Sequence, residues 1–301
     1  MFKFRLIIAL FIFVGLNSCK NDHPELPIEK NPFLVEKGQR PLVIAHRGGT
    51  YYFPENTMLA FGYSKEIGAD VLELDIHLSA DGKLVVCHDD TVDRTSDQSG
   101  PINKYTYAEL ATYNFGYQFK GPNGDYPYRS NPVKIPLLEE VFQSFSDKLM
   151  IVEIKSQGEL GKQCVPELLR LIEKYNMQKK VSVFSFEKNV IDHFVSLNKI
   201  DAYTGGSAND ILDFIVNAAN GTSDKLIIKY DMLVTPTTVS DFNLNLDHPS
   251  IINTAKNKKV SLCYWTVNDE PLMRRLIESG ADGIITDRAE LLQVVLEDMG
   301  F

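Results

Sequence analysis

Short apolar runs alternate with amphipathic segments from residue 41 to the end of the chain. Runs that are apolar on both faces are typical of parallel strands, and segments with one apolar face are typical of the helices that cover them. The runs that predict strands are 41–46, 70–76, 83–88, 148–155, 181–186, 201–205, 225–230, 260–267 and 282–286. The segments that predict helices are 56–67, 137–145, 165–175, 188–197, 209–219, 250–257 and 270–278. This alternation favours an α/β fold of the (β/α)8 TIM-barrel type over a doubly wound sheet.

The strand pattern departs from a regular barrel in two places. Nine strand candidates compete for the eight positions of such a barrel, and we expect the surplus one between residues 201 and 230. Only residues 77–82 separate the second run from the third, which is too short for the crossover helix of a parallel pair. Residues 91–136 carry frequent Tyr, Phe, Gly and Pro, and we expect a small cap insertion there, after the third strand and over the C-terminal rim. The predicted barrel is therefore slightly irregular.

The first 18 residues are typical of a lipoprotein signal peptide. Lys3 and Arg5 precede the apolar run 6–16, which is the layout of a secretory signal. Cys19 follows Leu-Asn-Ser, a sequence that resembles the bacterial lipobox, in which the cysteine is acylated. An acylated Cys19 would hold the protein to a membrane surface. The alternative is an ordinary secreted protein in which this cysteine is incidental.

These features predict an exported bacterial lipoprotein, membrane-anchored in the periplasm or at the cell surface. Residues 19–40 contain several prolines among scattered charges and are expected to form a tether. The barrel domain is expected at residues 41–301. After residue 16 the chain has no apolar run near the ~18 residues that a membrane helix needs.

Composition narrows the class of protein further. The chain has 301 residues, of which 44% are apolar, so it can bury a full core as one domain. Its net charge of −9 argues against broad nucleic-acid binding, which needs a basic surface. Cys87, Cys164 and Cys263 lie in or near apolar runs and are expected to be buried thiols without a disulfide framework.

Ionisable residues gather where the first four predicted strands end. An isolated buried charge costs several kcal/mol, so a purely structural barrel would not place one at each successive strand end. In this fold the C-terminal strand ends are where active-site groups project. The residues are His46 and Arg47, Glu73 and Asp75, His88 and Asp89, and Glu153 and Lys155.

Three of these carboxylates predict a site for a divalent cation. Glu73 and Asp75 are two residues apart, so on a strand they point to the same side. Together with Glu153 they offer hard oxygen ligands and no sulfur, which suits Ca²⁺ or Mg²⁺ and not structural zinc. A carboxylate pair that works without metal, as in glycosidases, is the alternative. The two histidines and the cationic side chains of Arg47 and Lys155 in the same set favour a substrate that contains a phosphate group.

The basic residues of this set suit phosphodiester chemistry. Arg47 and Lys155 can bind a phosphoryl group, the arginine through its planar fork. His46 and His88 are suited to general acid and base catalysis, because imidazole titrates near neutral pH. The sequence leaves open which histidine takes the proton and which donates it.

The motifs in this order resemble the glycerophosphodiester phosphodiesterase family, within the wider superfamily of phospholipase C-like phosphodiesterases. They are HRG at 46–48, PENT at 54–57, ELDIHLSADGKLVVCHD at 73–89, DRT at 93–95, VEIK at 152–155, SF at 185–186, WTVN at 265–268 and GIITD at 283–287. The resemblance implies a TIM-type barrel with a small cap after the second histidine. It also implies His46 and His88 as the catalytic pair, Glu73, Asp75 and Glu153 as ligands of a divalent cation, and Arg47 and Lys155 as phosphate contacts.

Other residues have two interpretations each. Glu55 lies near the site by resemblance, or it begins a helix, where an acid is favourable. Trp265 and Asn268 fall at the mouth of a late strand, where the indole can line the pocket or pack in the barrel core. His77 follows the acidic pair and is interpreted as structural.

We therefore expect a metal-dependent hydrolase that converts glycerophosphodiesters to glycerol 3-phosphate and an alcohol. Either water or a hydroxyl of the substrate can be the nucleophile. One alternative is a phosphodiesterase on the same barrel that acts on lysophospholipids or on a lipid-linked glycan. Another is a lipoprotein that binds phosphodiesters without catalysis. The expected partners are the small-molecule substrate and, through the lipid anchor, a membrane; the oligomeric state stays open.

Overall fold

The computed structural model describes residues 30–239 and 244–301. The expected signal peptide, the acylation site Cys19 and residues 19–29 of the expected tether lie outside the described residues, so these remain predictions. In the part of the chain that is described, no helix is long and apolar enough to cross a membrane.

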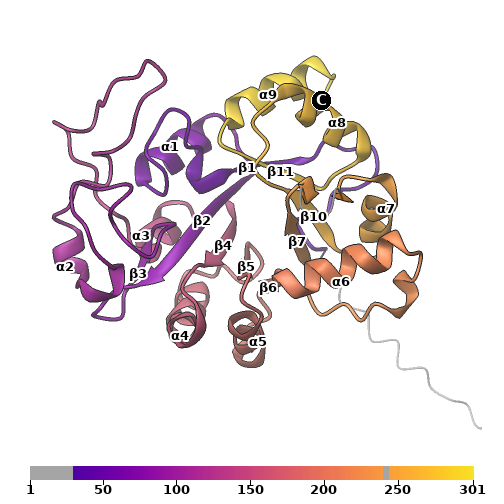
Figure 1. The fold of residues 1–301 in the computed structure, drawn as a ribbon, viewed down its shortest axis with the longest axis horizontal. Coiled ribbons are helices and arrows are strands. Elements are labelled where there is room, and N and C mark those ends of the chain that lie inside the picture. The colour runs from indigo at the N-terminus through magenta and orange to yellow at the C-terminus, as the bar shows by residue number, and fades with distance from the viewer. Residues whose placement is uncertain (1–29, 240–243) are drawn as a thin grey trace, which may run out of the picture. The chain divides into compact units, whose positions relative to one another are not determined.

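Eight parallel strands form a barrel in the described part of the chain (Figure 1). Their order is β6 (Tyr203–Thr204), β5 (Val181–Phe184), β4 (Leu149–Ile154), β2 (Val71–Leu78), β1 (Leu42–Ala45), β11 (Gly283–Thr286), β10 (Ser261–Tyr264) and β7 (Met232–Thr235). A single parallel bridge between Gly205 and Met232 joins the two ends of this order. The barrel is therefore nearly closed, and the predicted TIM-barrel fold is confirmed.

Helices surround the strands in Figure 1. They are α1 (Met58–Glu66), α3 (Leu138–Ser144), α4 (Gly158–Lys174), α5 (Lys188–Leu197), α6 (Ala208–Ala219), α7 (Pro249–Lys258), α8 (Glu270–Ser279) and α9 (Ala289–Asp298). Each of the seven predicted helices is present, and α9 is an additional one that the sequence pattern did not predict. Minor elements are η3 (Ser223–Lys225) and the pair β8 (Thr238–Val239) and β9 (Leu244–Asn245).

The run 83–88 is a strand, but it lies outside the barrel. Strand β3 (Leu84–Val86) pairs antiparallel with the end of β2, with His77 opposite Val85. The short connection between the two strands can only reverse the chain, so it forms a hairpin. The crossover from β2 to the next barrel strand, β4, is completed by α3 instead. β3 is therefore an added strand outside the barrel, and residues 91–136 follow this third strand of the chain, as predicted.

The run 225–230 is not a strand, which corrects one prediction. Leu226, Ile228 and Tyr230 pack against the core, whereas Ile227 is 81% exposed. The alternating pattern thus reflects an extended surface segment that forms no strand pairing. The barrel strand at this place is β7, which begins two residues later and is buried along its whole length.

Residues 91–136 form a substructure with its own small core, at the left of Figure 1. It contains η2 (Ile102–Lys104) and the short helix α2 (Tyr107–Leu110), whose N-cap Thr106 forms a capping box with Glu109. Its buried residues pack with Val85 of β3 and with Cys87, which follows that strand. They are Val92, Ile102, Leu110, Phe115 and Ile135.

Residues 31–40 belong to the barrel unit, which corrects the tether predicted there. Phe33 is fully buried and packs with residues that begin the barrel strands, such as Leu42 and Leu149. Its carbonyl accepts a hydrogen bond from Ser261 Oγ at 2.6 Å, and the amide of Val35 donates to Asp282 Oδ1 at 2.8 Å. This segment therefore plugs the N-terminal end of the barrel, because the interior there needs an apolar side chain to fill it.

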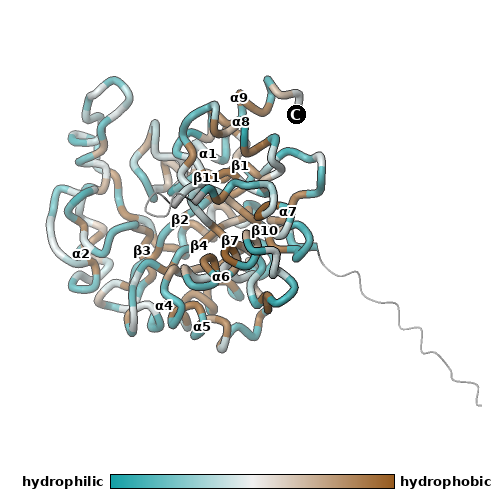
Figure 2. The backbone as a smooth tube through the Cα atoms, turned by 45° about the vertical axis from the view of Figure 1, so that its right-hand side comes forward, coloured by the Kyte–Doolittle hydropathy of each residue, from teal (hydrophilic) through white to brown (hydrophobic). Residues whose placement is uncertain are grey.

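Hydrophobic residues concentrate on the strands and on the helix faces that cover them (Figure 2). The interior of the barrel is a second apolar cluster that includes Ile44, Val71, Ile151 and Ile285. Cys87, Cys164 and Cys263 are buried free thiols, as predicted. Several buried polar and charged residues, among them Asp75 and Glu153, lie towards the C-terminal part of the strands, which is where the candidate site lies.

Candidate active site

The chain leaves β1 through the short 3-10 helix η1 (His46–Gly48). Within it, Arg47 has a φ of 50°, in the left-handed region that costs a non-glycine residue about 1 kcal/mol or more. Two hydrogen bonds of 2.8 Å hold this conformation: the Arg47 amide donates to Glu73 Oε2, and the Arg47 carbonyl accepts from the amide of Asn56. Strand β2 and the loop before α1 thus fix the backbone from which both basic side chains project.

Three buried carboxylates lie beside this turn. Glu73 and Asp75 come from β2, and Glu153 lies opposite Asp75 in the register of β4. One oxygen atom of each lies within 4.8 Å of the others. Burial and the Asp75 carboxylate raise the pKa of Glu73, and the same two causes raise the pKa of Glu153 to about 7. Like charges this close and this buried repel one another, so a proton or a nearby positive charge stabilises them.

Each of the two histidines is paired with a carboxylate. His46 Nδ1 lies 2.6 Å from Asp287 Oδ1, and His88 Nδ1 lies 2.7 Å from Asp89 Oδ1. Asn268 Nδ2 donates to the other oxygen of Asp287 at 2.6 Å. Such a carboxylate fixes the ring and places the proton of the neutral imidazole on Nδ1, so that Nε2 is the atom available for proton transfer.

The carboxylates of these pairs are held ionised. Burial raises the pKa of Asp287, but the hydrogen bond and charge interaction with His46 and the hydrogen bonds with Asn268 and Thr50 together outweigh burial, so the net pKa is lowered. Burial acts in the same direction on Asp89, and hydrogen bonds with Arg94 and His88 lower its pKa to about 2. Burial lowers the pKa of His88 itself. Both carboxylates are thus charged at neutral pH.

Cationic side chains surround the carboxylate cluster. Lys155 Nζ lies 3.0 Å from Glu153 Oε1, and Arg47 Nη1 donates to Glu55 Oε1 at 2.9 Å. Arg94, which comes from the cap, bridges Glu55 and Asp89 with N–O distances of 2.6 to 3.1 Å. The cap is therefore tied to both the phosphate-binding candidate Arg47 and the carboxylate partner of His88.

A cavity brings these groups together. It is lined by His46, Arg47, Glu73, Asp75, His88, Glu153, Lys155, Phe184, Phe186, Val234, Trp265 and Ile285. The aromatic residues form one wall, where the Phe186 and Trp265 rings lie 5.8 Å apart. Trp265 Nε1 is buried without a hydrogen-bond partner among the described residues. An unsatisfied donor of this kind favours a ligand with an acceptor at the wall.

All seven residues proposed for catalysis, metal binding and phosphate binding line this one cavity. Glu55 lies just outside it, in ion pairs with Arg47 and Arg94; the N-cap of α1 is Thr57. Trp265 lies in the cavity wall, whereas Asn268 contacts Asp287 and not the cavity.

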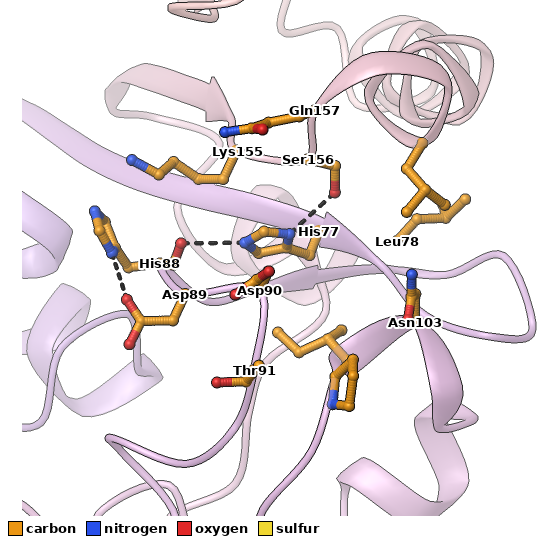
Figure 3. Close-up of a pocket in the computed structure, with 13 residues that line it drawn as sticks. His77, Leu78, His88, Asp89, Asp90, Thr91, Asn103, Lys155, Ser156 and Gln157 are labelled. Carbon is orange, nitrogen blue, oxygen red and sulfur yellow. Dashed lines mark hydrogen bonds and ion pairs between the residues drawn. The ribbon is translucent and has the colours of Figure 1, made fainter.

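His77 is buried and structural in its contacts, as predicted. Its Nδ1 lies 3.0 Å from Ser156 Oγ, and its Nε2 lies 3.1 Å from the carbonyl oxygen of His88 (Figure 3). Because a carbonyl can only accept, Nε2 carries a proton and Nδ1 accepts from the serine hydroxyl. The ring thus joins the segment of His88 to the loop that carries Lys155.

Sequence reasoning missed two members of the site, Asp287 and Arg94. Both stand in the quoted motifs GIITD and DRT, but their partners are 241 and 39 residues away in the chain, respectively. The signal for Asp287 was its position directly after the last barrel strand. Arg94 follows no strand, and only the fold of the cap brings it to Glu55.

Comparison with known proteins places the chain in a family. The sequence profile of the glycerophosphoryl diester phosphodiesterase family matches residues 46–291. A glycerophosphodiester phosphodiesterase of Caldanaerobacter subterraneus is 34% identical, over 84% of this chain and 96% of that protein. A lysophospholipase D of Homo sapiens is 26% identical, over 81% of this chain and 82% of that protein.

A solved structure shares the fold. It is a phosphodiesterase of Oleispira antarctica in complex with the product sn-glycerol-3-phosphate, with a TM-score of 0.68 and 22% identity, over 86% of this chain and 97% of that chain. At 22% identity this similarity shows only that the two chains share the barrel architecture. The match to the family profile and the similarity to the Caldanaerobacter protein are stronger evidence. Together they show that this chain belongs to the glycerophosphoryl diester phosphodiesterase family of phosphoric diester hydrolases.

Proposed function

We propose that the protein hydrolyses glycerophosphodiesters to glycerol 3-phosphate and an alcohol, with a divalent cation and with His46 and His88 as general acid and base. The observation that supports the proposal most is the pair of histidine–carboxylate contacts. They lie beside the buried carboxylate cluster and the cationic side chains of Arg47 and Lys155. A protein that only binds phosphodiesters needs the cationic side chains but does not need two imidazoles held in a fixed orientation.

The three carboxylates fit a divalent cation. They offer oxygen atoms only, they are buried, and the pKa of Glu153 is raised to about 7 by burial and by Asp75. This donor set suits Ca²⁺ or Mg²⁺. Glu73, Asp75 and Glu153 would hold the ion. When bound, it supplies Lewis-acid polarisation of a phosphoryl oxygen and lowers the pKa of a coordinated hydroxyl group.

The chain's own residues perform the remaining chemistry. Arg47 and Lys155 bind the phosphoryl oxygens and stabilise the charge that develops on them. One imidazole Nε2 removes the proton from the attacking oxygen, which forms a new P–O bond. The other imidazole gives a proton to the alcohol oxygen as its P–O bond breaks. The carboxylates of Asp287 and Asp89 stabilise whichever imidazole carries the positive charge.

A second candidate activity is that of a lysophospholipase D on the same site. The relative of Homo sapiens with that name supports it. So does the wall formed by Phe184, Phe186 and Trp265, because an aromatic surface can pack against an acyl chain. Assays of glycerophosphocholine beside lysophosphatidylcholine separate the two activities.

We also propose that the protein is an exported lipoprotein acylated at Cys19, with residues 19–29 as the remaining tether. The sequence of the first 19 residues supports this. Metabolic labelling with a fatty acid in a bacterial host is expected to label the wild-type protein and not Cys19→Ala. Equal labelling of both would contradict the proposal.

One assay tests the proposed activity directly. The purified protein is incubated with glycerophosphocholine and either Ca²⁺ or Mg²⁺, and glycerol 3-phosphate is measured with a coupled dehydrogenase. We expect turnover that a chelator abolishes and that the cation restores. Phosphorus NMR of the same reaction shows whether a cyclic phosphate forms first, which distinguishes a substrate hydroxyl from water as the nucleophile. Turnover that is unchanged by the chelator would refute the metal-dependent mechanism.

A further inference from the structure

A second cavity opens beside the site described above (Figure 3). Its volume of about 580 Å³ lies in the range of small-molecule sites. The two cavities share His88 and Lys155, whereas His46 and Arg47 line only the first. A phosphodiester has two ester arms. A phosphoryl group held in the first cavity, beside Lys155, can therefore direct one arm into the second.

The walls of this second cavity are fixed by the contacts of the described residues. His77 joins Ser156 to the carbonyl of His88, which holds two sides of the cavity together. The amide of Ile102 donates to the carbonyl of Asp90 at 2.9 Å. This hydrogen bond holds η2, which forms another side of the cavity, against the segment that carries Asp90. The cavity is thus preformed, so a ligand arm entering it need not order a loop.

The charges in this cavity leave one carboxylate without a partner. Lys155 pairs with Glu153, and Asp89 pairs with His88 and Arg94. Asp90 has neither a hydrogen bond to its carboxylate nor an ion pair among the described residues, and it faces the cavity (Figure 3). The charge of Asp90 acts on His77, which also lines the cavity. Burial lowers the pKa of His77, and the negative charge of Asp90 opposes this lowering.

We propose that this cavity holds the alcohol that leaves, and that Asp90 selects an alcohol with a positively charged ammonium group over a neutral one. The proposal rests on the proposed function. An ammonium group can pair with the Asp90 carboxylate, while Leu78, Ile102 and Leu160 contact the carbon atoms of the alcohol.

The same geometry assigns the proton transfers. The P–O bond to the alcohol in this cavity breaks, and its electron pair stays on the alcohol oxygen. His88 is the histidine that lines both cavities, so it donates the proton to that oxygen. His46 then accepts the proton of the attacking oxygen.

The test compares three substrates with one glycerol phosphate arm in common: glycerophosphoethanolamine, glycerophosphocholine and glycerophosphoglycerol. An exposed ion pair is worth up to about 1 kcal/mol, or about fivefold. We therefore expect kcat/KM of the wild-type enzyme to favour the two cationic substrates about fivefold at low salt. Asp90→Asn should remove this preference and leave the neutral substrate within about twofold. Glu159→Gln, which removes an exposed charge outside the cavity, should keep it.

Two results would overturn the proposal: a wild-type enzyme without preference, or equal losses on all three substrates in Asp90→Asn. Failure of the proposed function looks different, since the wild-type enzyme would then turn over none of them. In that case saturation-transfer NMR with free choline and ethanolamine tests the cavity alone. Binding that is lost in Asp90→Asn supports the cavity, and no binding to the wild-type protein refutes it.

Discussion

At the scale of single residues, we expect the carboxylate of Asp287 to control the proposed role of His46 in proton transfer. Replacing it by the amide in Asp287→Asn keeps the size of the side chain and removes the charge that stabilises an imidazolium. General acid and base catalysis contributes about 10²- to 10⁴-fold, so we expect kcat to fall by about 10²-fold or more. KM should change little, because Asp287 does not line the substrate cavity. Steady-state kinetics and circular dichroism check this expectation.

The matched control is Asp269→Asn in the neighbouring loop. Asp269 caps α8, and asparagine caps helices equally well, so this variant should retain full activity. If Asp287→Asn is as active as the control, Asp287 does not act through His46.

Also at this scale, the raised pKa of Glu153 links stability to pH. Burial and Asp75 raise it to about 7, above the value of about 4.3 for a free glutamate. Between these values the folded, metal-free protein holds a proton that the unfolded chain has released. Its free energy of unfolding must therefore fall as pH rises through this window.

Calorimetry of the chelator-treated protein tests this linkage. We expect Tm to fall between about pH 5 and 7, and to fall less in Glu153→Gln. Added Ca²⁺ or Mg²⁺ should raise the wild-type Tm most above pH 7, where the ligand is deprotonated. A wild-type Tm that rises over the same window would show that Glu153 does not have a raised pKa.

At the scale of elements, the strand ends were predictable and the partners of their side chains were not. Local pattern identified β1, β2 and β4, because a buried apolar run followed by charges is a signal contained in a few residues. It identified 83–88 as a strand but not its place outside the barrel, and it wrongly gave a strand at 225–230, because whether an extended segment joins the barrel depends on which neighbour it meets. It also gave no role to Asp287 or Arg94, since their contacts arise only when distant segments fold together.

The internal structure of the cap was not predictable from local sequence pattern. Variants of Arg94 test whether the cap positions groups of the site. Arg94 holds both Glu55 and Asp89 through a planar fork, a geometry that lysine cannot reproduce. We expect both Arg94→Ala and Arg94→Lys to lower kcat on the order of tenfold, as for other residues that orient a site group. Arg129→Ala, which removes a cap arginine stacked on Tyr126, should leave kcat unchanged. Kinetics that match between the Arg94 and Arg129 variants would exclude a positioning role for Arg94.

At the scale of the whole molecule, the barrel depends on a segment that precedes its first strand. Phe33 is fully buried at the N-terminal end of the barrel, and its ring meets Tyr203 edge-on at 5.9 Å. Removing a buried phenylalanine ring costs about 3–5 kcal/mol, because apolar burial is lost and a cavity remains. We expect Phe33→Ala to lower the free energy of unfolding by this amount in urea titrations. Phe301→Ala, at an exposed terminal residue, should lower it by less than about 0.5 kcal/mol.

The same variant separates stability from catalysis. Phe33 lies at the N-terminal end of the strands, where its ring meets Tyr203 and its carbonyl accepts from Ser261, whereas the proposed catalytic groups lie towards the C-terminal end. Folded Phe33→Ala should therefore keep the kcat of the wild-type enzyme at low temperature and lose activity at a lower temperature. A variant that unfolds at the wild-type urea concentration would mean that residues 31–40 do not stabilise the barrel. A variant that is stable but inactive would mean that the plug acts on the site through the strands.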